Sequence, residues 1–383
     1  MVQSFAFLIY FMHILLTGGG SGGHLMPLIA VARALKNLAE QEGIKLRMSY
    51  MGPTNFGRSF LELENIRIVG IHAPKWRRYV SGKNILDLLK IPLAMAEAFW
   101  NLFWIMPDVI FSKGGYGSMP ALAASRFYRI PVMLHESDSV PGLANRYAAK
   151  FAKRIFTSFP HTEKYFFGKP VLPAGNPVRA TLARCTVEQG RSILNVRYAK
   201  PVLFITGGSQ GAQRINDVVI NTLPHLLERY EVVHQCGSAS LEEIQSITQK
   251  EYKAELLQSY HVFGLLNEEQ MSAAYAVSDL VVSRAGASNI FEIAQAGKPS
   301  VIIPIQNSAN NHQTENAHAY AAAGACAVLD EQNLSQNLFL EIISGITGDR
   351  ERMHAMSQAA RAFAKPDAAD AIAQEIFAFV KRR

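Results

Sequence analysis

The sequence predicts an α/β protein with two domains in tandem, each built on a parallel β-sheet. Three observations predict this fold class. The chain of 383 residues is long enough for two domains with separate cores. Short apolar runs alternate with stretches of helical period, which is typical of β-α-β units. The alternation begins again after the prolines at 170–177, so we expect two Rossmann-like halves.

In the first half we expect six strands and five helices. The strands are expected at residues 12–16, 46–51, 66–71, 108–111, 131–134 and 154–157, and the helices at 26–41, 56–63, 85–105, 118–127 and 141–150. The apolar run at 5–16 is too short to span a bilayer and lacks a small-residue cleavage site. We therefore interpret 12–16 as a buried first strand, and residues 1–11 could be an extension from an upstream start codon.

The second half repeats the pattern. Its strands are expected at 201–205, 231–234, 260–263, 279–282, 300–303 and 326–329, and its helices at 211–228, 239–248, 268–276, 288–296, 312–323 and 335–343. We expect an N-terminal domain at 1–175 and a C-terminal domain at 176–365. Residues 366–383 are expected to form a final helix that packs back on the N-terminal domain.

The composition favours an anionic partner. The formal net charge is +7, which suits phosphates, nucleic acid or acidic lipid headgroups without choosing among them. The cysteines Cys185, Cys236 and Cys326 are far apart and form no CxxC pair. We therefore expect neither a disulfide framework nor a zinc site, and interpret each cysteine as a small buried apolar residue.

The segment GGGSGGH at 18–24 joins an expected strand to an expected helix. Glycines let backbone amides approach a ligand, and a helix N-terminus attracts an anion, so this loop suits a phosphate group. Gly18, Gly20 and Gly23 also match the G-x-G-x-x-G dinucleotide fingerprint. A nicotinamide dinucleotide needs an acidic residue after the second strand, where this chain has YMGPT at 50–54. We therefore favour a phosphate loop of another kind.

Two further glycine-rich segments follow expected strands. The segment GGSQG at 207–211 matches the nucleophile elbow of α/β-hydrolases, with Asp279 and His312 as triad partners. That elbow belongs in the middle of one large sheet, so we favour Ser209 as a hydrogen-bond donor to phosphate. The segment GGYGS at 114–118 is either a tight turn or a third ligand loop. Three such loops favour a ligand bound between the domains, at the carboxyl ends of two parallel sheets.

With these loops the chain resembles the UDP-N-acetylglucosamine–N-acetylmuramyl-(pentapeptide) pyrophosphoryl-undecaprenol N-acetylglucosamine transferases, the MurG family. The matching segments are GGGSGGHLMP at 18–27, KGGYGSMPALAA at 113–124, HESDSVPGLANR at 135–146, GNPVR at 175–179, GGSQGAQRIN at 207–216, SRAGASNIFEIAQAGKPSVIIP at 283–304 and NHQTENA at 311–317. They occur in family order and cover nearly the whole chain. The set is therefore far more specific than any one loop.

The resemblance implies both a fold and a reaction. The fold is GT-B, in which two Rossmann-like domains have parallel sheets facing an interdomain cleft. The reaction moves N-acetylglucosamine from UDP-GlcNAc to the undecaprenyl-diphosphate-linked N-acetylmuramoyl-pentapeptide, with inversion at the anomeric carbon, in peptidoglycan synthesis. The leaving UDP is stabilised by helix dipoles and hydrogen-bond donors, so no metal and no cofactor are expected.

The resemblance places most of the UDP-GlcNAc contacts in the C-terminal half. Glu292 is expected to accept hydrogen bonds from both ribose hydroxyls, because a carboxylate offers several lone pairs. Leu265 or Leu266 is expected to present backbone groups to uracil. The whole expected donor set is Gly19, Gly20, Ser21, Gly22, Gly23, Asp138, Arg179, Ser209, Gln210, Leu266, Ala287, Ser288, Asn289, Glu292, His312 and Gln313.

The resemblance places the lipid-linked acceptor on the N-terminal half. The expected acceptor-binding residues are Gly22, Gly115, Tyr116 and Asn145. A base must take the proton from the acceptor hydroxyl, and His24 and Glu136 are both candidates. His24 stands at an expected helix N-terminus, which favours the neutral, proton-accepting imidazole. Many family members have Glu-Gln-Asn where this chain has Glu136, Ser137 and Asp138.

A basic and aromatic segment at 75–83 precedes an apolar stretch at 91–106. Such a combination can lie on an anionic bilayer, although we favour the stretch at 91–106 itself as a core helix. The resemblance implies that the protein acts at the cytoplasmic face of the cell membrane. The expected partners are therefore UDP-GlcNAc, the lipid-linked acceptor and an anionic membrane surface, and no nucleic acid.

The sequence leaves two other functions open. The chain could glycosylate another lipid or polysaccharide precursor with the same fold. It could also be an inactive nucleotide-sugar-binding partner of a cell-wall complex, which would bind UDP without releasing it from UDP-GlcNAc.

Overall fold

The structure, a computed structural model, forms two compact units. It describes residues 11–20, 22–54, 57–72, 82–179, 182, 184–197, 200–208, 211–305 and 311–383, with the backbone alone for 82–89. The first unit runs to Ser137 and includes Pro141–Pro177 and Asp367–Arg383. The second contains Asp138–Val140 and Val178–Pro366. The chain passes between the main parts of the units at Pro177 and Val178, compared with the expected 175 and 176.

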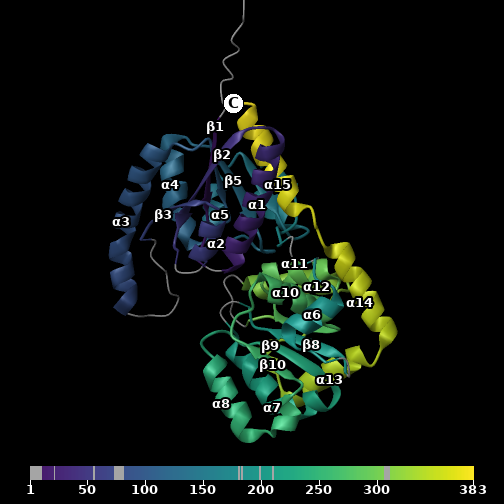
Figure 1. The fold of residues 1–383 in the computed structure, drawn as a ribbon. Coiled ribbons are helices and arrows are strands. Elements are labelled where there is room, and N and C mark those ends of the chain that lie inside the picture. The colour runs from purple at the N-terminus through teal and green to yellow at the C-terminus, as the bar shows by residue number, and fades with distance from the viewer. Residues whose placement is uncertain are drawn as a thin grey trace, which may run out of the picture. The chain divides into compact units, whose positions relative to one another are not determined.

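The first unit is built on a parallel sheet of seven strands in the order β3-β2-β1-β4-β5-β6-β7 (Figure 1). Its strands are β1 (Phe11–Thr17), β2 (Lys45–Gly52), β3 (Arg67–Gly70), β4 (Val109–Ser112), β5 (Val132–Glu136), β6 (Arg154–Thr157) and β7 (Val171–Pro173). The sequence predicts the first six and misses β7, a three-residue edge strand that ends in proline. A short run of this kind carries too little apolar pattern to be recognised.

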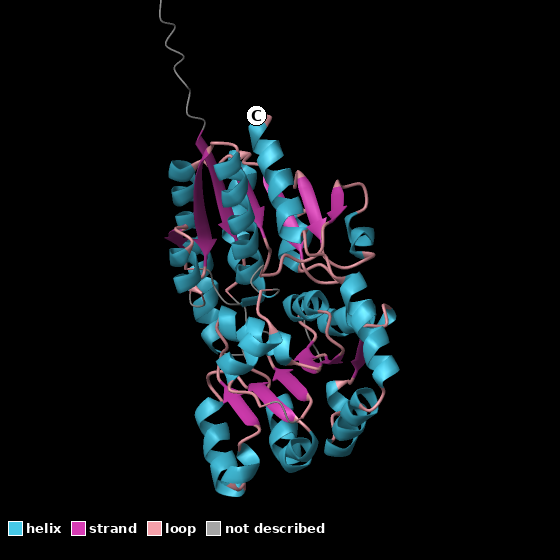
Figure 2. Cartoon of the chain, turned by 45° about the vertical axis from the view of Figure 1, so that its right-hand side comes forward, coloured by secondary structure: helices cyan, strands magenta, loops and turns pink. Residues whose placement is uncertain are grey.

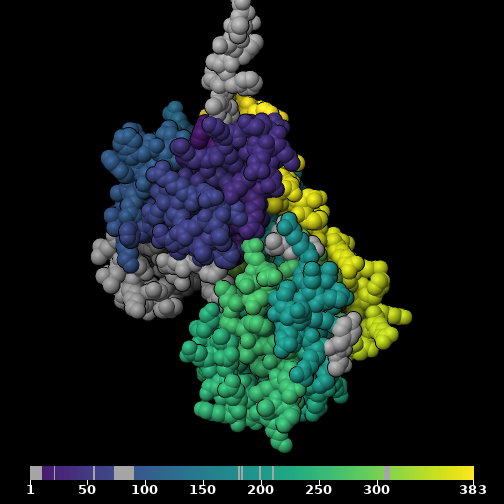
Figure 3. Space-filling view, in the orientation of Figure 1, coloured from purple at the N-terminus to yellow at the C-terminus, as the bar shows by residue number. Residues whose placement is uncertain are grey.

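Helices cover both faces of this sheet (Figures 1 and 2). On one face, α1 (Gly22–Gln41), α2 (Arg58–Leu63) and α15 (Ala368–Lys381) bury apolar side chains in a shared core. On the other face, α3 (Gly82–Ile105), α4 (Met119–Tyr128) and α5 (Leu143–Ala148) build a second core. The C-terminal helix α15 packs directly on α1, and its yellow surface lies against the first unit in Figure 3.

Helix α1 begins at Gly22, four residues before the predicted start at residue 26. Gly22, Gly23 and His24 therefore lie in its first turn, and Pro27 lies within the helix. Glycine and proline are the residues that most often end helices, so the apolar pattern places the start too late. The early start brings His24 to the N-terminal end of a helix of 20 residues.

The second unit repeats the architecture with six parallel strands in the order β10-β9-β8-β11-β12-β13. The strands are β8 (Val202–Thr206), β9 (Glu231–Gln235), β10 (Tyr260–Phe263), β11 (Leu280–Arg284), β12 (Ser300–Ile303) and β13 (Cys326–Val328). The helices are α6 (Val187–Leu194), α7 (Gln213–Arg229), α8 (Leu241–Glu251), α9 (Ala254–Leu257), α10 (Glu268–Val277), α11 (Ala287–Ala296), α12 (His312–Ala322), α13 (Gln336–Thr347) and α14 (Arg350–Phe363). All six predicted strands of this half are confirmed.

The sequence misses α6, α9 and α14. Helix α6 has a recognisable start, because Thr186 and Gln189 form a capping box in which each side chain bonds to the other's backbone N–H. Helix α14 buries only Met356 and Ala360, so it lacks the apolar stripe by which a helix is recognised.

The interpretation of residues 91–106 as a core helix is wrong for half of this helix. Ala94, Ala98 and Leu102 of α3 are buried, but Trp100 is 66% exposed and Trp104 is 68% exposed. Small residues allow α3 to pack closely on α4 with one face, and the large aromatic residues remain outside. The basic segment at 75–83 lies mostly outside the described residues.

The cysteines differ in burial. Cys236 is fully buried as expected, whereas Cys185 and Cys326 are partly exposed. The interpretation of all three as buried apolar residues is therefore wrong for Cys185 and Cys326.

Candidate active site

Each sheet has one point where the strand order reverses. In the first sheet this switch point lies between β1 and β4, and in the second between β8 and β11. Open parallel sheets bind their ligands outside the carboxyl ends of the strands at such points. The segments that follow these four strands include the three glycine-rich loops of the sequence, so each unit has a candidate site of its own.

In the first unit, His24 lies between two glycine loops. A Cβ on Gly19 would come within 3.1 Å of His24 Nδ1, and a Cβ on Gly115 within 3.0 Å of His24 Nε2. Gly115 also has a φ of 82°, a conformation that side chains rarely tolerate. Glycine at both positions therefore leaves room for the imidazole between the loops. The His24 side chain is partly exposed.

Tyr116 joins the same two loops. Its hydroxyl would lie 2.9 Å from a Cβ on Gly20, so only glycine leaves room for the phenol. Burial raises the pKa of Tyr116, and a hydrogen bond with the backbone of Gly20 partly opposes that shift. The structure thus brings together Gly19, Gly20, His24, Gly115 and Tyr116 at the first switch point.

Glu136 ends β5 and is 3% exposed. Its Oε2 accepts hydrogen bonds from Gly142 N at 3.1 Å and from Asn145 Nδ2 at 2.9 Å. Asn145 Nδ2 also donates to His135 O at 3.1 Å. Asn145 Oδ1 is buried, has no hydrogen-bond partner and lies against Gly114. Glu136 and Asn145 are therefore held by each other, and Asn145 offers an unused acceptor oxygen beside the glycine loop.

Lys113 separates β4 from the glycine loop at 114–118 and is 2% exposed. Its ammonium donates to Ser137 Oγ at 2.6 Å and Asn176 Oδ1 at 2.8 Å, and lies 2.6 Å from His135 Nδ1. Burial, and then repulsion by Lys113, lowers the pKa of His135 well below its ordinary value. This cluster was not predicted, although a lysine directly after a buried strand and before two glycines is a visible signal.

In the second unit, Arg179 and Glu292 form a buried ion pair. The side chain of Glu292 is 6% exposed, and its Oε1 accepts from Arg179 Nε at 3.0 Å and Nη2 at 2.8 Å. Tyr275 donates its hydroxyl to Glu292 Oε2 at 3.3 Å. Burial acts to lower the pKa of Arg179, but attraction to Glu292 outweighs it and raises that pKa. Burial and the charge of Glu292 raise the pKa of Tyr275 well above its ordinary value.

This arrangement fixes the carboxylate while leaving it able to bind more. Each carboxylate oxygen has two lone pairs; Arg179 uses both on Oε1 and Tyr275 one on Oε2, so Oε2 can accept one further hydrogen bond. Tyr275 was not predicted as a site residue. No motif distinguishes a core tyrosine of an amphipathic helix from one that orients a carboxylate.

The loop after β8 meets the first turn of α11 at the second switch point. A Cβ on Gly208 would lie 3.5 Å from Asn289 Nδ2, which donates to Ser283 Oγ at 2.9 Å. Gln235 links this loop to Leu266, because it donates to Gly208 O and accepts from Leu266 N, both at 3.3 Å. Leu266 is buried, and its N–H is bonded to Gln235.

The other expected residues of the donor set have these positions. Ala287 and Ser288 begin α11, and His312 and Gln313 begin α12. Gln313 Oε1 accepts a hydrogen bond from Ile305 N at 3.0 Å. Asp138 belongs to the second unit, where its Oδ1 accepts from Asn316 Nδ2 at 2.8 Å. Ser21, Ser209 and Gln210 lie outside the described residues, while Gly22 and Gly23 lie in the first turn of α1.

The hydrolase alternative is excluded by the position of Asp279. Asp279 Oδ2 accepts from Val202 N, the first residue of β8, at 2.8 Å. The segment at 207–211 follows the opposite end of this five-residue strand, about 16 Å away at a rise of 3.3 Å per residue. A triad requires hydrogen-bond contact between its members, so Asp279 cannot serve one at that loop.

Two family models cover most of the chain. The glycosyltransferase family 28 N-terminal domain matches residues 14–157, and the glycosyltransferase family 28 C-terminal domain matches residues 202–372. The fold and the two switch-point sites, together with these matches, define a glycosyltransferase of the GT-B fold.

Comparison with similar proteins identifies the family within this class of glycosyltransferases. The UDP-N-acetylglucosamine–N-acetylmuramyl-(pentapeptide) pyrophosphoryl-undecaprenol N-acetylglucosamine transferase of Treponema denticola is 34% identical, over 96% of this chain and 97% of that protein. A Bacillus cereus protein of the same name, numbered 2, is 36% identical over 88% of this chain and 92% of its own. The chain belongs to the family of these N-acetylglucosamine transferases.

Solved structures agree with this placement. The crystal structure of Acinetobacter baumannii MurG has a TM-score of 0.69 at 26% identity, and the match covers 96% of this chain and 99% of that one. The UDP-GlcNAc 2-epimerase of Neisseria meningitidis, bound to UDP-GlcNAc, has a TM-score of 0.65 at 15% identity, with 96% and 100% covered. At that identity the likeness to the epimerase concerns the fold alone.

Proposed function

We propose that this protein transfers N-acetylglucosamine from UDP-GlcNAc to the undecaprenyl-diphosphate-linked N-acetylmuramoyl-pentapeptide, as an inverting enzyme of peptidoglycan synthesis. The observation that carries this proposal is the relationship to transferases of that name over nearly the full length of the chain. The sites at both switch points support it, because each unit has glycine loops suited to a diphosphate.

The second unit binds the donor in this proposal. Glu292 accepts a hydrogen bond from a ribose hydroxyl with the lone pair of Oε2 that Tyr275 leaves unused. Leu266 presents its backbone to uracil, and Asn289 lies beside the loop that receives the diphosphate. The N-terminal turn of α11 adds partial positive charge there, which stabilises the leaving UDP.

The first unit binds the acceptor, and His24 acts as the base. Its imidazole is partly exposed and lies between the glycine loops that hold the acceptor diphosphate. It takes the proton from the attacking sugar hydroxyl while the oxygen of that hydroxyl bonds to the anomeric carbon and UDP departs. Glu136 is buried and is oriented by Gly142 and Asn145. This position suits a role in ordering the loop more than a role as proton acceptor.

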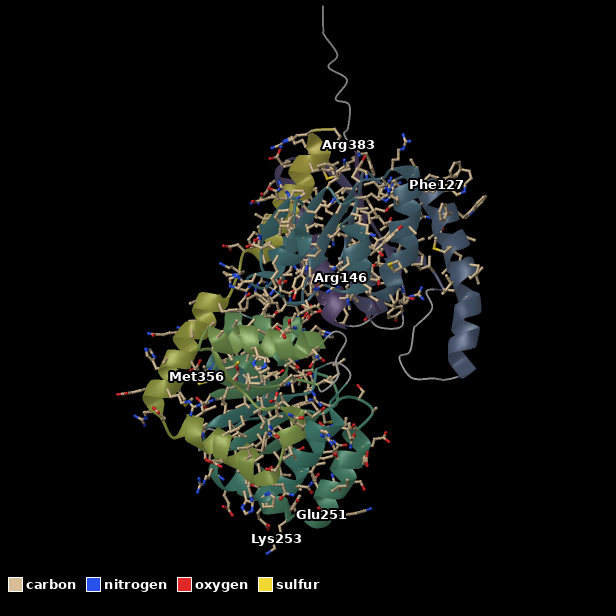
Figure 4. The ribbon with its side chains drawn as sticks, turned by 180° about the vertical axis from the view of Figure 1, so that it is seen from behind. Phe127, Arg146, Glu251, Lys253, Met356 and Arg383 are labelled. Carbon is tan, nitrogen blue, oxygen red and sulfur yellow. The ribbon has the colours of Figure 1, made fainter. Side chains whose placement is uncertain are left out.

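The proposal places the enzyme on the cytoplasmic face of the cell membrane, as a peripheral protein. Among the described residues, no helix has the length and apolar character needed to cross a bilayer. Trp100, Phe103 and Trp104 of α3 and Phe127 of α4 are exposed and contact one another or Tyr128 edge to face (Figure 4 shows Phe127 at the surface beside α3). Exposed aromatic residues of this kind insert at the headgroup boundary.

A turnover assay tests the proposal. The full chain is mixed with UDP-GlcNAc and a short-chain lipid-linked muramyl-pentapeptide, and UDP release is measured. We expect release that requires this acceptor. Release only with a different lipid or polysaccharide precursor would replace the acceptor in the proposal. UDP binding without release under any of these conditions would establish an inactive binding protein instead.

A further inference from the structure

Strand β9 lies between β8 and β10 in the second sheet (Figure 1). The chain after β8 enters the glycine loop at 207–211, which receives the diphosphate in the proposed function, and the chain after β10 leads to Leu266. Gln235 is the last residue of β9 and is 1% exposed. It therefore stands at the carboxyl end of the sheet, between two segments of the proposed donor site.

The side-chain amide of Gln235 bonds to both of these segments. Its Nε2 donates to Gly208 O and to Thr206 Oγ1, both at 3.3 Å, and its Oε1 accepts from Leu266 N at 3.3 Å. These partners determine the orientation of the amide, because the reverse orientation would bring two oxygens together at Gly208 and two donors together at Leu266. The amide therefore connects the two segments through both of its ends.

Thr206 strengthens the connection to Gly208. The Oγ1 atom that accepts from Gln235 also accepts from Gly208 N at 3.1 Å. Gly208 O, the other acceptor for Gln235, also accepts from Gly211 N at 3.1 Å. The N–H and the C=O of Gly208 are thus both bonded within this group, so the Gln235 amide helps to set the conformation in which the glycine loop begins.

The backbone that follows β9 also contacts both segments. On the side of β10, Gly237 N donates to Gly264 O at 2.9 Å. On the side of β8, a Cβ on Gly211 would come within 2.6 Å of Cys236 O. The end of β9 therefore separates the two segments and sets the distance between them.

A fixed distance between these segments matters for a nucleotide. The base and the diphosphate of UDP are joined through one ribose, so they reach their two binding segments at a limited spacing. A site that already has this spacing binds more tightly, because the ligand does not have to order the protein. Burial of an amide costs free energy unless it is hydrogen-bonded, and here its bonds all serve to connect the two segments.

We propose that Gln235 is a positioning residue for the nucleoside diphosphate of the donor. Its amide holds the start of the glycine loop at Gly208 in a fixed place relative to the segment at Leu266. Since Gln235 is buried, it acts through these two segments. This inference rests on the proposed binding of UDP-GlcNAc to the second unit.

Three variants test the connection. Gln235→Met removes the amide and keeps the length of the side chain. Thr206→Val removes the hydroxyl that bonds to both Gln235 and Gly208 and keeps the shape of the side chain. Thr222→Val is the matched control, because Thr222 is also a buried threonine of the second unit, and its hydroxyl donates to Val218 O within α7 at 2.6 Å.

The first measurement is calorimetric titration of UDP into the full chain. We expect the Kd for UDP to rise about tenfold in Gln235→Met and about threefold in Thr206→Val, because hydrogen bonds that order the loop are lost. The Kd in Thr222→Val should stay within about 1.5-fold of the native value. Equal UDP affinity in Thr206→Val and Thr222→Val would reject the inference, even if Gln235→Met fails to fold.

The variant Gln235→Glu adds a pH profile that a loss of packing would not produce. A carboxylic acid can donate to Gly208 O and accept from Leu266 N, whereas a carboxylate can only accept. Burial raises the pKa of a carboxyl group, so the ratio of the Kd for UDP in this variant to the native Kd should rise about tenfold between about pH 6 and pH 9. Titration of UDP, and of the neighbouring His234 and Cys236, affects both proteins and cancels in the ratio. A loss of affinity that is equal at both pH values would reject the role of the donated hydrogen bond.

Steady-state turnover separates this inference from the proposed function. The KM for UDP-GlcNAc should rise about tenfold in Gln235→Met, while kcat and the KM for the lipid-linked acceptor change less than about threefold. An unchanged KM for UDP-GlcNAc in an active enzyme would reject the inference alone. UDP affinities in the expected order, in a protein that does not turn over the acceptor, would reject the proposed transfer and leave the role of Gln235 standing.

Discussion

Glu292 is held by two neighbours before any nucleotide arrives. Arg179 bonds to one oxygen of the carboxylate and Tyr275 to the other. Preorganisation of this kind strengthens binding, because the ligand does not have to order the side chain. We therefore expect Tyr275 to affect nucleotide affinity through the orientation of Glu292.

Substituting Tyr275 by Phe should raise the Kd for UDP about fivefold, or about 1 kcal/mol, since one hydrogen bond to a charged group is lost. Calorimetric titration of UDP measures this. Tyr260→Phe is the matched control, because Tyr260 is also buried in the second unit but contacts His234 instead. Equal loss in both variants would mean that Tyr275 acts only through the packing of the core.

Substituting His24 by Gln should lower kcat by two to four orders of magnitude if His24 is the base. Glutamine keeps a polar side chain between Gly19 and Gly115 but cannot accept the proton. UDP affinity, which belongs to the other unit, should change less than twofold. Near-native turnover in His24→Gln, with a large loss in Glu136→Gln, would transfer the role of base to Glu136.

Helix α3 has one buried face and one exposed aromatic face. Its alanines pack on α4, and Trp100, Phe103 and Trp104 remain exposed. Burial of one large aromatic side chain is worth about 2 kcal/mol, so three of them can hold a protein at an interface.

The variant with Trp100, Phe103 and Trp104 all changed to Ser should bind vesicles containing anionic phospholipid at least tenfold more weakly. Sedimentation with the vesicles measures the bound fraction. Leu63→Ser is the control, because Leu63 on α2 is 75% exposed and lies away from this aromatic cluster. Turnover of a short-chain acceptor in detergent should be unaffected. An equal loss of vesicle binding in the control would contradict a role for α3 in particular.

Strands were the most predictable elements of this chain. A strand buried on both faces is a continuous apolar run, as in Val202–Thr206, and needs no knowledge of its neighbours. Helix α14 could not be predicted, because it buries only Met356 and Ala360, meets α11 through the ring of Phe363 and has no wide apolar stripe. Exposure of the aromatic face of α3 was also hidden, since apolar periodicity does not say which face is covered.

The candidate site was predictable in part, through motifs that are continuous in sequence. His24 and Glu292, which lie in α1 and α11, belong to such motifs. The cluster of Lys113, His135 and Asn176 depends on the order β4-β5-β6-β7, which brings together segments up to 63 residues apart. No local pattern contains that order.

Across the molecule, each unit buries a neutral histidine. His135 in the first unit has a pKa well below its ordinary value, chiefly because it is buried, and burial lowers the pKa of His234 in the second unit to about 3. The unfolded chain binds a proton at each of these positions below about pH 6.5, and the folded chain does not. Folding therefore becomes less favourable as the pH falls through that value.

We expect each histidine to lower the free energy of unfolding by about 1 kcal/mol between pH 6.5 and pH 5.5. Calorimetric unfolding at several pH values measures this, and the transition that UDP stabilises identifies the second unit. His234→Gln should make that transition less sensitive to pH, whereas His318→Gln, at an exposed position of α12, should not. Identical pH dependence in the two variants would contradict the assignment.

The position of α15 has a consequence for biosynthesis. Ile372, Ile376 and Phe377 complete the core over α1, yet the ribosome makes them only after the whole second unit has been translated. The second unit can thus fold while the nascent first unit still has an uncovered apolar groove. A chaperone would bind the growing chain at that groove. Once α15 leaves the ribosome, it can cover the groove and the chaperone is no longer needed.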